Sequence, residues 1–255
     1  MVNAMAASPS NSLLQKVLRA SADAECCAHD HNEGHVKKGR RTNRGKFTAC
    51  LTLMEEQFVF RNLDRLLVPV REAIVDASTS LEADREGDPD WFDCHVDEET
   101  DVIENLLGVA FLICQCHVTE VVSKVVMLHK LYVKNYPDNV LTTTSGSKRD
   151  IIGFGLDSVG SYTAVTVLDA FANYFKHRDE WHGDWDTLPA RSLHTAAIVE
   201  SVGGSQGSSG NMRTGAEALG NPSYASVEVF AQVLRSWRTE LADAYHNELA
   251  IRGLV

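Results

Sequence analysis

The sequence predicts an all-α protein, a bundle of four or five main helices, on the strength of three observations. Apolar residues recur at steps of three or four along most of the chain, which places them on one face of an α-helix. No alternating apolar and polar run is long enough to indicate a strand. The length of 255 residues, 44% of them hydrophobic, is sufficient for one well-formed core.

Composition limits the classes of function. The net charge of −11 argues against a general nucleic-acid coat or a binder of anionic membranes, but leaves room for a local basic site. Six cysteines occur without a secretory signal, which predicts reduced thiols and a cytoplasmic protein. The apolar stretch 106–128 is interrupted by charged and polar groups, which favours a buried helix of a soluble bundle over a membrane span.

Residues 1–46 are predicted to form a separate N-terminal part, a short helix followed by a connector. Its segment Cys26–His35 holds two cysteines and three histidines, which could ligate zinc, but the spacing matches no standard zinc module and favours a polar connector. The segment Lys37–Lys46 carries six positive charges and no negative one. It is either an arm that contacts phosphate or a solvated loop, and the absence of an interleaved aromatic favours the loop.

Residues 47–255 are predicted to form the helical bundle domain. Residues 47–81 have the apolar spacing of a long helix, which Pro69 is expected to kink or to end near Leu67. Residues 82–93 are acidic and contain glycine and proline, so we expect a loop there.

Residues 97–136 are predicted to form the central helix of the domain. A helix that is apolar on most sides is usually buried between others, and Pro137 is expected to stop it. Its main apolar row consists of Leu107, Phe111, Cys114, Val118, Val121, Val125, Leu128 and Tyr132.

The second half of the domain is predicted to contain three further helices. A connector over 139–160 leads to a helix over 161–181 and a shorter one over 190–201. Residues 202–220 have the composition of a flexible loop. Pro222 then opens a last helix, whose expected core face is Val227, Phe230, Ala231, Leu234, Trp237, Leu241 and Tyr245.

The helix expected over 161–181 is the best candidate for chemistry, because its residues separate into two faces. The expected buried stripe is Val165, Leu168, Ala172 and Phe175. The other face is a continuous polar ladder of Tyr162, Thr166, Asp169, Asn173, Lys176, His177 and Glu180.

His177 is the residue of this ladder best suited to catalysis. Asn173 lies one turn before it, and Lys176 is adjacent in sequence. A histidine beside a cation and near an amide can act as acid or base on a phosphodiester, while the cation stabilises the developing charge. The alternative is a polar helix face with an ordinary exposed histidine.

A metal site is the weaker interpretation of the same stretch. It would use His177, Asp179, Glu180 and His182. A separation of five positions between the two histidines rotates them about 140° from each other on a helix. That is not the spacing that places two ligands on one face, so we predict no metal and no cofactor.

Residues 172–177 read Ala-Asn-Tyr-Phe-Lys-His, on a helix that follows long antiparallel helices. This arrangement resembles the HEPN superfamily of helical domains, many of which are metal-independent ribonucleases of toxin–antitoxin, CRISPR and phage-defence systems. Their usual motif is an arginine, a polar residue, three further residues and a histidine. Asn173 and His177 match that motif, whereas Ala172 stands at the arginine position. The resemblance extends over roughly residues 47–248.

The resemblance implies an all-α HEPN-like fold and a homodimer in which the two histidine-bearing helices face each other. It implies binding of RNA or a nucleotide. The protein would be a metal-independent ribonuclease, or an inactive relative of one, in a defence or toxin–antitoxin system. His177 would be the general acid or base, Asn173 its orienting or phosphate-contacting partner, and Lys176 or Arg178 the cation. The further candidates for ligand contact are Asp169, Glu180, Trp181 and His182. The alternative function is a non-catalytic interaction bundle whose ladder recognises a partner protein.

Overall fold

The computed structural model describes residues 43–55, 57–87, 92–181 and 184–255. These residues belong to one compact unit of the chain, 41–255. The expected N-terminal helix, the Cys26–His35 segment and most of the Lys37–Lys46 segment lie outside the described residues, as does His182.

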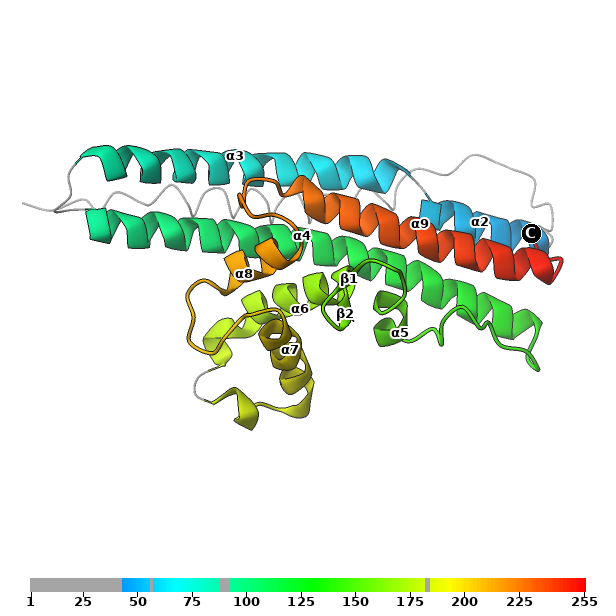
Figure 1. The fold of residues 1–255 in the computed structure, drawn as a ribbon. Helices are drawn as coiled ribbons and strands as arrows, with labels where there is room; N and C mark the ends of the chain where they lie inside the picture. Colours follow the sequence, from blue (N-terminus) through cyan, green and yellow to red (C-terminus); the bar gives the residue numbers. More distant parts are fainter. Residues whose placement is uncertain (1–42, 56, 88–91, 182–183) are drawn as a thin grey trace, which may run out of the picture. The chain divides into compact units, whose positions relative to one another are not determined.

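Helix α4 (Phe92–Asn135) is the central element of this unit. It packs against α2 (Asn43–Glu55), α3 (Gln57–Gly87) and α9 (Glu228–Ile251), which lie along one side of it, while α5 to α8 lie along the other side (Figure 1). Such a position requires a helix that is apolar on most sides. Every residue of the predicted apolar row from Leu107 to Tyr132 is buried, which confirms the prediction of a central helix.

The second side of α4 is covered by shorter elements. They are α5 (Lys148–Ile152), the strands β1 (Ser158–Val159) and β2 (Tyr162–Thr163), α6 (Ala164–His177), α7 (Ala190–Ser201) and α8 (Asn211–Ala218). The strands form a small antiparallel hairpin in which Val159 pairs with Tyr162. Two 3-10 turns, Arg178–Glu180 and Trp185–Thr187, follow α6.

The predominantly helical fold confirms the all-α prediction. Helix α7 coincides with the predicted helix over 190–201. The predicted core face of α9 is buried at all seven positions, from Val227 to Tyr245.

Several boundaries differ from the predictions. The helix expected over 47–81 corresponds to two helices, α2 and α3, the central helix α4 begins at Phe92, and the connector expected over 139–160 contains α5. Pro69 lies inside α3 and does not end it, and α3 continues to Gly87, so the expected acidic loop is helical over 82–87. The strand hairpin precedes α6, which begins at Ala164 and ends at His177. The expected flexible loop contains α8, because a buried carboxylate on α4 supplies acceptors for the N–H groups at the start of that helix.

Two glycines allow α6 to lie close to its neighbours. A Cβ atom at Gly108 of α4 would lie 2.1 Å from the Phe175 ring, and one at Gly215 of α8 would lie 2.6 Å from the Phe171 ring. Glycine weakens a helix by about 1 kcal/mol relative to alanine, so its presence inside two helices is explained by these aromatic rings.

One segment of the described chain, Asp97–Asn135, is long and apolar enough to cross a membrane by length and composition. Of its most apolar window, 50% is buried inside the protein, and core helices of soluble proteins meet the same criterion.

Candidate binding cleft beside helix α6

Helix α6 starts at a threonine cap that also ties it to α5. The Thr163 hydroxyl oxygen accepts a hydrogen bond from the Thr166 backbone N–H, at 3.2 Å. The hydroxyls of Thr163 and Thr166 donate to the Ile152 carbonyl oxygen, at 2.6 and 3.2 Å. The end of α5 and the first turn of α6 are therefore held side by side.

The polar ladder of α6 is not the continuous surface that the sequence predicts. Thr166 and Asp169 are buried, 9% and 6% exposed, and Asn173 is half-buried, whereas Lys176 and His177 are exposed. The prediction is wrong for the first half of the ladder because other elements cover that face of the helix. Phe175, predicted to lie in the core stripe, is only half-buried.

Asp169 is the centre of a hydrogen-bond network that joins three elements. Its Oδ1 accepts from Gln115 Nε2 of α4 at 2.9 Å and from Lys148 Nζ of α5 at 2.8 Å. Its Oδ2 accepts from Asn173 Nδ2 at 3.2 Å, and Asn173 Oδ1 accepts from Gln115 at 3.0 Å. The network positions the Lys148 ammonium group, whose side chain is 48% exposed, against a carboxylate that is 8% exposed.

A cleft of about 230 Å³ lies beside this network. It is bounded by α5, β2, α6 and α7, and its lining includes Arg149, Tyr162, Asp169, Asn173 and His194. Several members of the predicted ladder therefore do share one concave site, but on the covered side of α6.

Two basic side chains line the cleft, and further cations lie on the same helices. Arg149 and His194 line it. Lys176 lies nearby: burial lowers the pKa of this lysine, the charges of Lys148 and Arg191 lower it further, and Asp169 opposes them. Within the described parts of the chain, no ion pair or side-chain hydrogen bond engages Arg149, Lys176, Arg191 or His194.

The neighbouring acidic residue of α5 forms no ion pair with these cations in the described structure. Asp150 accepts a hydrogen bond from the Ser145 backbone N–H at 2.6 Å, and the hydrogen bonds from Ser145 lower the pKa of this carboxyl group. Its carboxylate is thus engaged with the connector that precedes α5.

The residues predicted to be catalytic do not converge on one point. His177 Nδ1 lies 3.2 Å from Glu180 Oε2 at the exposed end of α6. Both amide atoms of Asn173 are used by the Asp169 network. Arg178 donates to Asn105 Oδ1 of α4 at 2.7 Å and stacks 4.7 Å from the centre of the Phe175 ring.

The other predicted contact residues are distributed differently. Trp181 is buried in an aromatic cluster, with its ring 5.5 Å from Tyr174 and 5.7 Å from Trp185, so it contributes to packing. Glu180 is exposed beside His177. Among the residues that the structure describes, no group of three or more His, Cys, Asp or Glu side chains could hold a metal ion.

Several residues of the cleft, of the Asp169 network and of the helices around them were not predicted. Lys148 and Arg149 are adjacent cations in a Ser/Thr/Gly-rich connector, and Gln115 is a polar residue between apolar ones on α4. Both features are visible in the sequence, but nothing local to them indicates that they meet Asp169. His194 and Arg191 carry no local signal beyond residue type.

No protein-family model matches the chain, and no curated protein or solved structure is significantly similar to it.

Proposed function

We propose that this protein binds a phosphate-bearing ligand, a nucleotide or the end of an RNA, in the cleft between α5, β2, α6 and α7. One observation carries the proposal. In a chain of net charge −11, two basic side chains without partners in the described structure, Arg149 and His194, line a cleft whose carboxylate already accepts from three donors.

The chemistry of the side chains suits phosphate. Arginine presents a planar fork of N–H donors that matches phosphate oxygens, so Arg149 is the expected principal contact. Lys176 and Lys148 add positive charge, and His194 adds a donor. The half-buried ring of Tyr162 gives a base a surface on which to stack.

The size of the cleft limits the ligand. Its volume of about 230 Å³ lies below the range of about 300–1,000 Å³ typical of pockets for drug-sized molecules. It suits one phosphate-bearing unit, such as a mononucleotide or the terminal nucleotide of a longer RNA.

Binding in this cleft does not require cleavage. The role of His177 as a general acid or base rests on the resemblance to HEPN domains, and it stays a prediction. In the described part of the chain, His177 has Glu180 as its hydrogen-bond partner, while Asn173 donates to Asp169.

The test is a binding measurement with a 5′-phosphorylated short RNA, a nucleoside monophosphate and inorganic phosphate. The variant Arg149→Ala/Lys176→Ala should weaken binding by about tenfold or more, which corresponds to about 1.4 kcal/mol. Arg71→Ala is the matched control, because it removes a cation of α3 that pairs with Glu228 away from the cleft. Absence of binding by all three probes, or an equal loss in the control, would overturn the proposal.

The same RNA samples test the prediction of ribonuclease activity. Cleavage that persists with a chelator and disappears in His177→Ala would support it, while intact RNA bound through Arg149 would identify a binding protein. Light scattering of the same samples measures whether the homodimer implied by the resemblance forms.

A further inference from the structure

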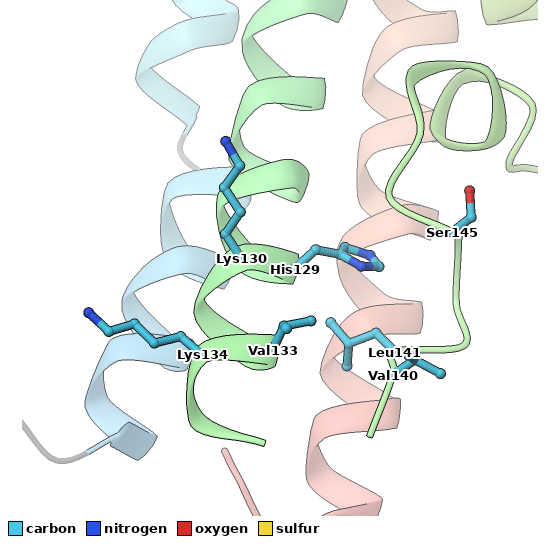
Figure 2. A pocket seen from close by; sticks show the side chains of 7 residues that line it. All are labelled: His129, Lys130, Val133, Lys134, Val140, Leu141 and Ser145. Carbon is cyan, nitrogen blue, oxygen red and sulfur yellow. The ribbon is translucent and has the colours of Figure 1, made fainter. Parts of the chain in front are cut away.

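A second hollow lies at the other end of the second side of α4, independent of the cleft. It is a groove of about 730 Å³ between the last turns of α4 and the connector over 137–147. In Figure 2, His129 and Val133 point from α4 toward the connector, and Leu141 points back toward α4. Lys130 and Lys134 also line the groove, at the other edge of α4, and their side chains extend away from the connector (Figure 2).

The surface of this groove is apolar and exposed. Val133 is 48% exposed and Val140 is 68% exposed, so two aliphatic side chains that line the groove face water. Leu141 beside them is buried and fixes the connector to the protein. A single exposed valine is common on protein surfaces. Two exposed valines that line the same concave site indicate a contact surface.

The connector that forms one wall is firmly held in place. Glu248 of α9 accepts hydrogen bonds from the backbone N–H and the hydroxyl of both Thr142 and Thr143, at 2.7 to 3.0 Å. Arg252 donates to the Val140 carbonyl oxygen at 3.0 Å. These hydrogen bonds hold Val140 in its exposed position, so a partner would bind a preformed groove.

His129 is also fixed. Its Nε2 lies 2.7 Å from the Tyr245 hydroxyl, which in turn lies 2.7 Å from the Thr144 hydroxyl. This ring therefore forms part of the groove floor, and the free charge of the site comes from the lysines.

The two lysines give the groove its charge. In the described structure neither Lys130 nor Lys134 makes an ion pair, and no acidic residue lines the groove. Residues four apart on a helix have Cβ atoms about 5–6 Å apart, so the two lysines place two flexible positive charges along the same edge of α4. Such an edge is complementary to carboxylates that are themselves one helical turn apart.

We propose that this groove binds an acidic amphipathic helix of a partner protein. Apolar side chains of that helix would cover Val133 and Val140, and a pair of its carboxylates at positions i and i+4 would meet Lys130 and Lys134. A helix is about 10 Å wide, so it can cover an open groove. A single acyl chain is thinner and would leave part of the groove exposed. An anionic membrane is the less favoured occupant, because the net charge of −11 opposes it.

The test uses a synthetic helical peptide of about 14 residues with Leu at i, i+3 and i+7 and Glu pairs at i, i+4. Its counterpart carries Lys in place of Glu. Fluorescence anisotropy with the full chain should give a dissociation constant of about 1–100 µM for the acidic peptide, a range typical of modest helix-in-groove contacts.

Charge reversal provides the decisive comparison. Lys130→Glu/Lys134→Glu should weaken binding of the acidic peptide by about tenfold or more and create binding of the lysine peptide. Arg65→Glu/Arg71→Glu on α3 makes the same change in net charge and should leave the acidic peptide bound. Val140→Ser should weaken binding, whereas Val75→Ser, at a valine of α3 that is 44% exposed, should not.

Three outcomes would overturn the proposal. The first is no binding of the acidic peptide below about 1 mM by a protein whose circular dichroism and melting temperature are normal. The second is a loss of binding in the α3 control equal to that in the groove variant. The third is binding of phosphatidylserine vesicles or RNA, in place of the peptide, that disappears in the groove variant.

Discussion

Glu104 of α4 and Asp169 of α6 are both buried carboxylates with three hydrogen-bond donors, but the donors differ in kind. Glu104 accepts from the backbone N–H groups of Met212 and Arg213 and from the Arg213 side chain, at 2.9 to 3.0 Å. Asp169 accepts from three side chains, which belong to α4, α5 and α6. Asp169 lines the cleft, whereas neither Glu104 nor the residues that donate to it do so.

The difference separates a structural role from a site. Backbone N–H groups at the start of α8 would be unsatisfied without Glu104, which therefore acts as a cap supplied by another helix. Asp169 holds side chains, including the Lys148 ammonium group, at the edge of a concave surface. Loss of Glu104 should therefore chiefly lower the stability of the fold. Loss of Asp169 should chiefly change the positions of the side chains around it.

The largest expected effect is on Glu104. Glu104→Ala should lower the free energy of unfolding by about 3–5 kcal/mol, because it leaves the Arg213 side chain and two backbone N–H groups without their acceptor. Urea unfolding followed by circular dichroism measures it. Glu104→Gln, which keeps one acceptor oxygen, is expected to lose less, and a loss below about 1 kcal/mol in Glu104→Ala would contradict the role as a cap.

Leu168→Ala should be nearly as damaging, although Leu168 is next to Asp169 in the sequence. Its side chain is fully buried, so truncation should cost about 2–5 kcal/mol. Val75→Ala on α3, at a position 44% exposed, is the control and should cost much less. A small loss for Leu168→Ala would mean that the apolar face of α6 contributes little to its stability.

Asp169→Asn should have a smaller effect on stability, about 1–2 kcal/mol, because the substitution keeps the shape and one oxygen acceptor. The ion pair that it removes involves a lysine that is 48% exposed, where screening by water limits the contribution. The same unfolding measurement applies. A loss equal to that of Glu104→Ala would erase the distinction between the two carboxylates.

A third carboxylate, Glu248, extends the comparison to pH. Burial acts to raise the pKa of Glu248, but hydrogen bonds from Thr143, Thr142 and Arg252 outweigh it and lower the pKa to about 2, from an ordinary value of 4.5. A lowered pKa in the folded state contributes stability above about pH 4.5 that is lost as the pH falls toward 2. Melting temperatures of the wild type should therefore fall more steeply across this window than those of Glu248→Gln. Parallel curves would contradict the effect.

The smallest expected effect is on His177. Its side chain is 48% exposed and, among the residues that the structure describes, pairs only with the exposed Glu180, so His177→Ala should change the free energy of unfolding by less than about 0.5 kcal/mol. The melting temperature measures it. A larger loss would mean that the end of α6 contributes more to the fold than its exposure indicates.

The predictable parts of the fold are those with a local signal. The apolar rows of α4 and α9 repeat at the helical period, and both were predicted position by position. The start of α8 could not be predicted in this way, because the carboxylate that accepts from Met212 lies 108 positions earlier in the chain. The passage of α3 through Pro69 also depends on packing along α4, which outweighs the local cost of proline.

The candidate site was predictable only in part. Asp169 and Asn173 were singled out from their spacing on one helix face, and both belong to the cleft. Lys148, Arg149 and His194 come from other elements, so the pattern on α6 carried no information about them. The emphasis on His177 followed from residue type and sequence spacing, which do not reveal that Asn173 turns toward Asp169.

The sequence by itself determined that the long segments of α4 and α9 are helical and which of their residues form the core, because periodicity is a property of neighbouring residues. Only the tertiary structure decided which polar groups of α6 meet solvent and which meet a cleft. That choice depends on what packs against the helix, and here the covering groups, Gln115 and Lys148, lie 54 and 21 positions from Asp169 along the chain.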